Sequence, residues 1–191
     1  MRILALDTAT LTASVAAWID GAAAASGEAR AETHSEKLLP LVDDVLRRAG
    51  LRPADLDAIA CGAGPGSFTG LRIGLATAKG LCTALGCPLH LVSSLAALAK
   101  DAGVVGPVLA VLDARRKEVF AGLYGPGAKD EAVLAPADLA AYSVPGAIVV
   151  GDGAAARFTG DVPSASSPTE AADGVCRRST RTVPAAAAKS G

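Results

Sequence analysis

A glycine-rich segment near the middle of the chain carries the residues best suited to anion chemistry. Residues 62–70 read Gly-Ala-Gly-Pro-Gly-Ser-Phe-Thr-Gly and precede an apolar helical pattern. A glycine turn that opens a helix can aim backbone N–H groups at a phosphate. The Walker pattern, however, needs Lys and then Ser or Thr after its last glycine, and a G-x-G-x-x-G pattern begun at Gly64 meets Thr69 in place of its third glycine. We therefore favour a structural role, in which the glycines turn the loop sharply and let the helix approach a neighbour closely.

A polar turn near the N-terminus, Asp7-Thr8-Ala9-Thr10, lies between two strand patterns and resembles the first phosphate hairpin of actin-like ATPases and sugar kinases. In such a hairpin an acid positions a metal ion and small residues admit phosphate. Ala9 stands where glycine is usual, so a methyl group occupies the phosphate's approach. Asp113 and the segment 151–153 follow later strands and could serve the remaining nucleotide loops. For each of these features we favour a plainer interpretation, namely acids solvated at strand ends and glycines in turns. The candidate nucleotide ligands are Asp7, Thr8, Thr10 and Asp113.

Composition and residue counts exclude several other kinds of site. Lys and Arg number 18 against 19 Asp and Glu, a formal charge of −1, which supplies no field for holding a polyanion unaided. The four cysteines form no C-x-x-C pair and there are only two histidines, so no zinc site or other metal centre is expected. No G-x-S-x-G motif occurs. No apolar run is long enough to span a membrane and no signal peptide pattern opens the chain, so we expect a cytoplasmic protein.

The elements that must position these residues follow from hydrophobic periodicity. Segments 2–7, 12–18 and 22–31 read as an antiparallel meander, and 57–64 reads as a buried strand leading into the glycine turn. Residues 34–50 form a helix with an apolar sector wider than one packing surface needs. The helix 68–85 is apolar nearly all round. We therefore expect both helices to pack on two surfaces, one of which can be another chain.

The second half of the chain predicts a further sheet. A helical stretch after residue 93 precedes strands at 107–114, 117–124 and 146–153. From residue 160 onward there is no Leu, Ile, Phe, Met, Trp or Tyr, so this segment has little apolar surface to offset its ordering entropy. The expected organisation is a first lobe at 1–106, a partial second lobe at 107–160, and a disordered or aberrant tail at 161–191, whose removal should leave thermal stability nearly unchanged.

Four segments together resemble one family. They are LALDTAT, HSEKLLPLVDDVLRRAGL, GPGSFTGLRIGLATAKGLCTALGCPL and LDARRKEVFAGLY, and they extend over residues 1 to about 153. Their amino-acid sequences and their order along the chain are similar to those of the TsaB family, also called YeaZ. The resemblance implies an α/β, two-lobed, actin-like fold of the ASKHA class. The C-terminal segment departs from the family, so a truncated second lobe is one expectation.

The resemblance also implies a function. TsaB proteins take part in making threonylcarbamoyladenosine beside the tRNA anticodon, as non-catalytic partners of the catalytic relative TsaD and of the ATPase TsaE. It implies no cofactor, a homodimer when TsaD is absent, and contact with tRNA only through the complex. Two alternatives remain open, an actin-like ATP-dependent phosphotransferase and a metal-dependent carbamoyltransferase. The residues expected at the partner interface are Leu38, Leu41, Val42, Val45, Ser67, Phe68, Gly70, Arg72, Gly74, Ala78 and Leu81.

One comparison with TsaD discriminates between these functions. TsaD has a similar glycine loop and helix, then a strand and a His-x-x-x-His metal pair. In this chain Ser94 and Leu98 stand at the two histidine positions, so the metal used in the transfer reaction has no such anchor. We expect a subunit without TsaD-type catalysis. We also expect Gly74→Leu to weaken chain association more than it harms the fold, because Gly74 lies opposite the polar line of its helix.

Overall fold

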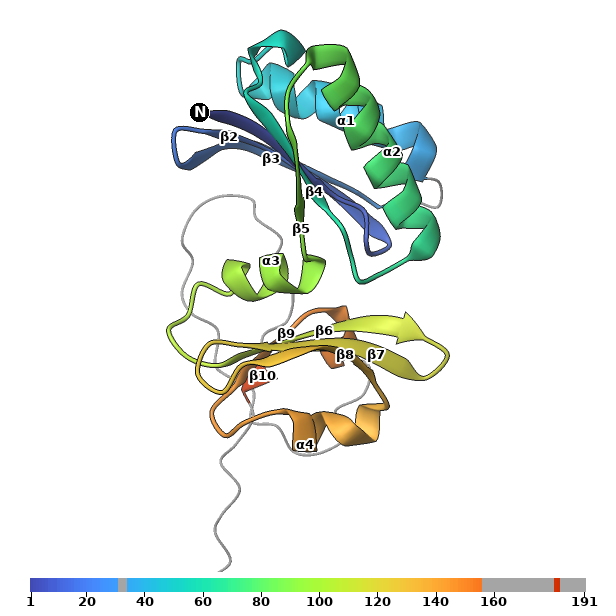
Figure 1. Ribbon diagram of the computed structural model, residues 1–191, viewed down its shortest axis with the longest axis vertical. Coiled ribbons are helices and arrows are strands. Elements are labelled where there is room, and N and C mark those ends of the chain that lie inside the picture. The colour runs from blue at the N-terminus through green and yellow to red at the C-terminus, as the bar shows by residue number, and fades with distance from the viewer. Residues whose placement is uncertain (31–33, 156–180, 183–191) are drawn as a thin grey trace, which may run out of the picture. The chain divides into compact units, whose positions relative to one another are not determined.

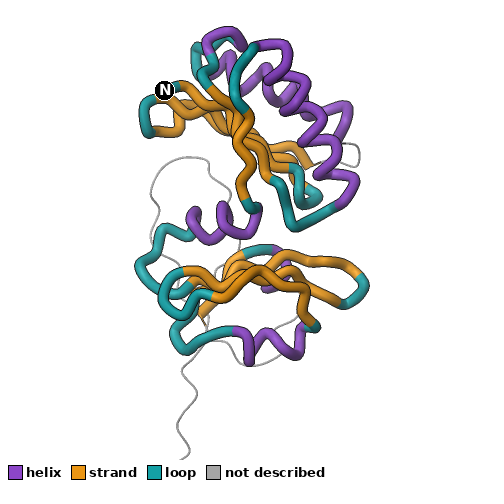
Figure 2. The backbone as a smooth tube through the Cα atoms, in the orientation of Figure 1, coloured by secondary structure: helices purple, strands orange, loops and turns teal. Residues whose placement is uncertain are grey.

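The computed structural model describes residues 1–30, 34–155 and 181–182. The chain divides into two compact units, Met1–Ser94 and a second unit that begins at Leu95 (Figure 1). Each unit contains one sheet and its own helices (Figure 2). Within the described residues, no helix combines the length and the apolar character that crossing a membrane requires.

The first unit is built on a five-stranded mixed sheet. The strands are β1 (Arg2–Asp7), β2 (Thr12–Ile19), β3 (Ala22–Arg30), β4 (Ala58–Gly62) and β5 (Leu89–Val92), in the order β3-β2-β1-β4-β5. The first three form the predicted antiparallel meander, whereas β1, β4 and β5 run parallel. Asp20 and Gly21 both have positive φ and make the tight β2–β3 turn. Because β1 and β4 are parallel, Asp7 at the end of β1 lies at the same edge of the sheet as the end of β4.

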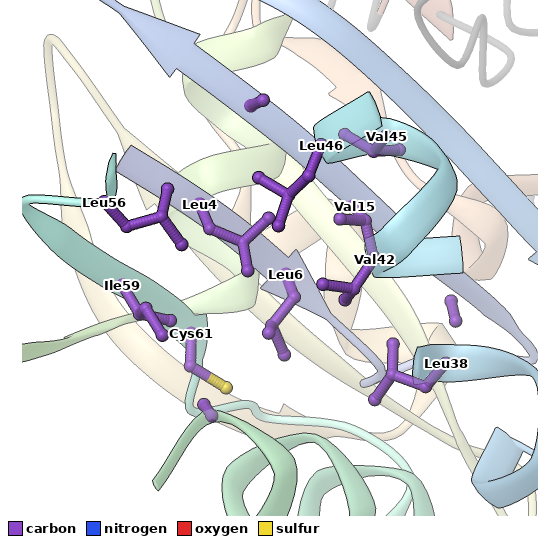
Figure 3. Packing of buried hydrophobic residues seen from close by; sticks show 13 residues of the cluster. Leu4, Leu6, Val15, Leu38, Val42, Val45, Leu46, Leu56, Ile59 and Cys61 are labelled. Carbon is purple, nitrogen blue, oxygen red and sulfur yellow. The ribbon is translucent and has the colours of Figure 1, made fainter. Parts of the chain in front are cut away.

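Two helices cover one face of this sheet. Helix α1 (His34–Arg48) packs on β2 and β3, and α2 (Phe68–Leu85) packs on β4 and β1, with the short helix η1 (Pro53–Asp55) between α1 and β4. In the core between them Leu4 and Leu6 meet Leu38, Val42 and Val45 (Figure 3). The apolar spacing in the sequence predicted both helices, and Gly50, with φ of 69°, follows the end of α1 as expected.

The second unit has a sheet with a core on each face. Its strands, in the order β10-β9-β6-β7-β8, are β6 (Val108–Arg115), β7 (Glu118–Tyr124), β8 (Lys129–Leu134), β9 (Ile148–Val150) and β10 (Arg181–Thr182). One core lies around Val111 and Leu123, and the other holds Leu95 and Ala110. The sequence reading missed β8, whose side chains are half-buried or exposed and therefore show little apolar alternation. The remaining helices are α3 (Ser94–Asp101), η2 (Pro136–Asp138), α4 (Leu139–Tyr142) and α5 (Asp152–Ala155).

Two expectations about the domain organisation differ from the structure. The division falls after Ser94 and not at residue 106, because Leu95 and Ala99 of α3 belong to a core of the second sheet. The tail at 161–191 was expected to be disordered or aberrant; within it the structure describes residues 181–182, which form β10, paired antiparallel with β9. A strand edge offers backbone hydrogen bonds that need no apolar side chain. The rest of that expectation lies outside the described residues.

Candidate functional site

The carboxylate of Asp7 is held inside the first unit by two hydrogen bonds. Its Oδ1 accepts from the backbone N–H of Ala9 at 2.6 Å, and its Oδ2 accepts from the Ser94 hydroxyl at 2.6 Å. Ser94 is almost fully buried. Gly62 lies so close that a Cβ there would stand 2.5 Å from Cγ of Asp7. Both carboxylate oxygens of Asp7 therefore have hydrogen-bond partners within the chain. An actin-like enzyme would use the acid at this position to hold a metal ion.

Thr8 is buried against the start of α2. Its side-chain oxygen donates a hydrogen bond to the carbonyl of Gly70 at 2.8 Å. A Cβ on Gly70 would overlap the Thr8 carbonyl, and one on Gly74 would overlap the Thr8 side chain. The predicted close approach of a glycine-bearing helix to a neighbouring backbone is thus confirmed, and the neighbour is the β1–β2 turn of the same chain.

Two backbone N–H groups of the glycine loop, those of Ser67 and Gly70, donate hydrogen bonds within the chain. Ser67 donates its N–H to the carbonyl of Ala9 at 2.7 Å, and its hydroxyl caps α2 by accepting from the N–H of Gly70 at 3.2 Å. A Cβ on Gly66 would stand 2.6 Å from Cβ of Ala9. Thr10 makes a local turn with Thr12, through its own hydroxyl. The predicted structural role of the loop fits these contacts better than a phosphate cradle does.

The fourth candidate ligand, Asp113, lies in the second unit at the end of β6. Its Oδ1 accepts from the N–H of Arg115 at 2.8 Å, and its own N–H donates to Asp152 at 3.2 Å. Gly151 and Gly153 pack directly over the β6 backbone. These contacts shape the turn that follows β6. In the part of the chain that the structure describes, no three His, Cys, Asp or Glu side chains lie together as metal ligands.

The thiol nearest to this region is protonated at neutral pH. Cys61 is buried beneath the sheet, and burial, with a smaller contribution from the Asp7 carboxylate, raises the pKa of its thiol to about 11. A thiol with this pKa carries almost no thiolate at pH 7 and is a poor nucleophile. Cys61 is thus a free thiol that is fully buried, where the sequence predicted partial burial.

The residues expected at a partner interface separate into two groups. Six of them are buried inside the first unit and are not surface residues: Leu38, Val42, Val45, Gly70, Gly74 and Ala78. Figure 3 shows the three from α1 within the core. A helical wheel cannot distinguish a face that packs on the chain's own sheet from a face that packs on another chain. Gly74→Leu should therefore harm the fold first, because Gly74 touches Thr8. The other five are half-buried or exposed: Leu41, Ser67, Phe68, Arg72 and Leu81.

The outer side of α2 has unusual surface residues. Phe68 is 74% exposed, and the guanidinium of Arg72 lies 5.4 Å from the centre of its ring. Gly80 is also exposed, and a Cβ there would have no atom within 4 Å. Leu39 of α1 is 53% exposed. The sequence reading did not place Gly80 or Leu39 among the interface residues, although a glycine inside a helix without a local reason was a usable signal.

Comparisons with known proteins bear on this arrangement. The family described as "TsaD: tRNA N6-adenosine threonylcarbamoyltransferase" matches residues 27–173. The chain is 42% identical over 146 residues to the tRNA threonylcarbamoyladenosine biosynthesis protein TsaB of Escherichia coli, covering 71% of this chain and 63% of that protein. TsaB of Bacillus subtilis is 37% identical over 129 residues, covering 65% and 55% respectively.

A solved structure matches as well. YeaZ from Pseudomonas aeruginosa superposes with a TM-score of 0.64 at 42% identity, over 71% of this chain and 67% of that one. The chain thus spans less than two thirds of the length of the two curated relatives. The two sheets with their helices confirm the expected α/β class, and the superposition shows that the chain shares the YeaZ fold. On the family match, the sequence identity and the shared fold, this chain belongs to the TsaB (YeaZ) family, which is related to TsaD.

Proposed function

We propose that this chain is a non-catalytic scaffold subunit of the complex that installs threonylcarbamoyl on the adenosine beside the tRNA anticodon. Its partners would be TsaD and the ATPase TsaE, in the cytoplasm, with tRNA bound only through the complex. Family membership gives the pathway, since the curated relatives are named as tRNA threonylcarbamoyladenosine biosynthesis proteins.

The non-catalytic part of this proposal is supported by the contacts that fill the Asp7 turn from within the chain. The carboxylate accepts hydrogen bonds from Ala9 and Ser94, and α2 packs its glycines against the Thr8 backbone. A nucleotide in this place would have to displace hydrogen bonds of a part-buried carboxylate, each worth about 1.5–3 kcal/mol. Ser94 itself, which stands at a metal-histidine position of TsaD, is committed to Asp7.

The scaffold part is supported by the outer side of α2. Phe68, Arg72 and Gly80 lie within about 120° of one another on a helix with 3.6 residues per turn. An exposed phenylalanine with an arginine over its ring is the kind of anchor found at protein interfaces. The exposed Gly80 would let a helix of the partner approach α2 closely. We propose that this face of α2, formed by Phe68, Arg72 and Gly80, pairs with TsaD, or with a second copy when TsaD is absent.

Two measurements on the full chain test the proposal. The chain should co-sediment with the TsaD of its own organism, and calorimetric titration of the isolated chain with ATP and magnesium should give neither tight binding nor hydrolysis. Absence of a TsaD complex would contradict the scaffold role. Nucleotide hydrolysis by the isolated chain would contradict the non-catalytic role and favour a phosphotransferase.

A further inference from the structure

The turn between β6 and β7 has an unusual backbone for its residue types. Arg115, Arg116 and Lys117 have φ of 65°, 49° and 66°, in the left-handed region that favours glycine and asparagine. All three are exposed, and only two residues connect the strands. A turn of this shape is ordinarily built from Asn-Gly or Asp-Gly. The chain instead has three consecutive cations in a conformation that strains them, which indicates a use for their side chains.

The shape of this turn is fixed from the sheet side. The Asp113 carboxylate accepts the N–H of Arg115 at 2.8 Å, and Asp152 accepts the N–H of Asp113 at 3.2 Å. The β6–β7 register shifts between Asp113 and Arg115, so that Arg115 faces Glu118 across the ladder. The two aspartates thus bind backbone N–H groups below the turn, and Arg116 and Lys117 form its tip.

The three cations differ from four other arginines of the described residues, which pair with carboxylates. Arg2 pairs with Asp57, and Arg52 pairs with Asp55. Asp44 likewise holds two arginines of α1. Within the described ranges, none of the three turn cations has a carboxylate within the 4.0 Å of an ion pair, even though acids lie beside them in sequence. Because no described carboxylate pairs with them, their exposed side chains can bind a ligand from outside the chain.

We propose that this basic turn, Arg115–Lys117, contacts backbone phosphates of the tRNA when the complex presents it, an inference that rests on the proposed function. One arginine side chain can donate two parallel hydrogen bonds to the oxygens of a phosphate group. Such contacts position a nucleic acid without reading its sequence. A three-residue tip is too small for a protein interface of about 800 Å² per partner, whereas a phosphate contact needs only one or two side chains. A chain with a net charge of −1 cannot hold RNA by its overall field, so this contact adds to binding by the partners.

The test variant removes the three positive charges of the turn and replaces them by residues that tolerate its positive φ angles. The triple variant Arg115→Asn, Arg116→Asn, Lys117→Gly replaces each residue by one that tolerates positive φ, so its melting temperature should equal or exceed that of the wild type. The control variant Arg30→Gln, Lys37→Gln, Lys100→Gln removes three exposed positive charges elsewhere. Each variant is combined with TsaD, and binding of a tRNA transcript is measured by fluorescence anisotropy over a salt series.

The basic-turn variant should assemble with TsaD like the wild type and bind tRNA roughly 10- to 100-fold more weakly at low salt. The plot of log K against log salt concentration should become less steep, its negative slope shrinking in magnitude by about 2 to 3, since each lost phosphate contact removes roughly 0.7 to 0.9. The control should keep the wild-type slope. An equal loss in both variants would overturn the inference and indicate a general charge effect.

Two further results would also overturn it. Unchanged tRNA affinity of the basic-turn variant in an intact complex would do so while leaving the proposed function in place. Lost assembly with TsaD, at unchanged tRNA affinity per complex, would assign the turn to an acidic protein partner. If the wild type forms no complex with TsaD, the proposed function fails. In that case the inference fails with it, because the turn needs the complex to present the tRNA.

Discussion

Glycines in the two halves of α2 have opposite surroundings. In the first half, Gly70 and Gly74 touch the backbone and side chain of Thr8, so a larger residue has no room. In the second half, Gly80 is exposed, and an added Cβ would meet nothing within 4 Å. A glycine inside a helix costs about 1 kcal/mol relative to alanine. The chain itself accounts for that cost at the first two positions only, which is why we assign the helix face that carries Gly80, Arg72 and Phe68 to an intermolecular contact.

The largest expected effect is that of Gly74→Leu. The new side chain would collide with Thr8 and break its hydrogen bond to Gly70, so we expect a loss of about 3 kcal/mol in the free energy of unfolding. This corresponds to a melting temperature lower by roughly 10 to 20 °C. Thermal melts with Gly80→Leu as the matched control measure the difference. Equal melting of Gly74→Leu and the wild type would remove the intrachain contact from this account.

The second expected effect, Gly80→Leu, reverses the pattern. Helix propensity improves by a little under 1 kcal/mol, so the free chain should melt at or above the wild-type temperature. A leucine on a close helix contact commonly costs about 1 to 3 kcal/mol, which gives a roughly 5- to 150-fold weaker dissociation constant with TsaD or in self-association. Sedimentation over a concentration series measures it. An unchanged dissociation constant would place the partner on another face.

The third effect concerns the closed Asp7 turn beside the first half of α2. Ser94→Ala removes a hydrogen bond to a carboxylate and should lower the free energy of unfolding by about 1 to 2 kcal/mol. Urea denaturation measures it, with Thr83→Ala as the control, because that exposed hydroxyl bonds only the Lys79 carbonyl of its own helix. If both variants unfold alike, the Ser94 bond does not hold the turn.

The smallest effect lies outside both halves of α2, in the connection between α1 and β4. A side-chain hydrogen bond from Arg52 is the main cause that lowers the pKa of Asp55 to about 2. A lowered folded-state pKa gives stability that is present above the ordinary value near 3.8 and lost as the pH falls through about 2. Arg52→Gln should flatten the stability curve between pH 4 and pH 2, measured by urea unfolding at each pH. A curve parallel to that of the wild type would contradict the pairing.

Much of the fold could be predicted from the sequence because its signals are local. The alternation in β1 and β2 and the helical spacing of α1 and α2 reflect burial on one sheet face. The strand β8 escaped because an edge strand with few buried side chains lacks that pattern. The division after Ser94 was not predicted from the sequence, because it depends on which sheet Leu95 packs against and no local pattern encodes that.

The candidate site was only partly predictable for a related reason. Asp7, Thr8 and the glycine loop were recognisable by residue type, but the bond between Ser94 and Asp7 joins residues 87 apart in the chain. The periodicity of α2 indicated two packing surfaces, but it could not indicate which of its residues pack within the chain. Buried Gly74 and exposed Gly80 therefore look alike in sequence and differ only once Thr8 is in place.

Hydrogen–deuterium exchange of the full chain, alone and mixed with the TsaD of its organism, tests the central claim most directly. The account predicts a complex in which backbone amides of α2, above all those around Arg72 and Gly80, exchange more slowly than in the free chain, while those of β3 are unchanged. Formation of no complex, or protection that spares α2, would contradict the assignment of this helix face to the partner.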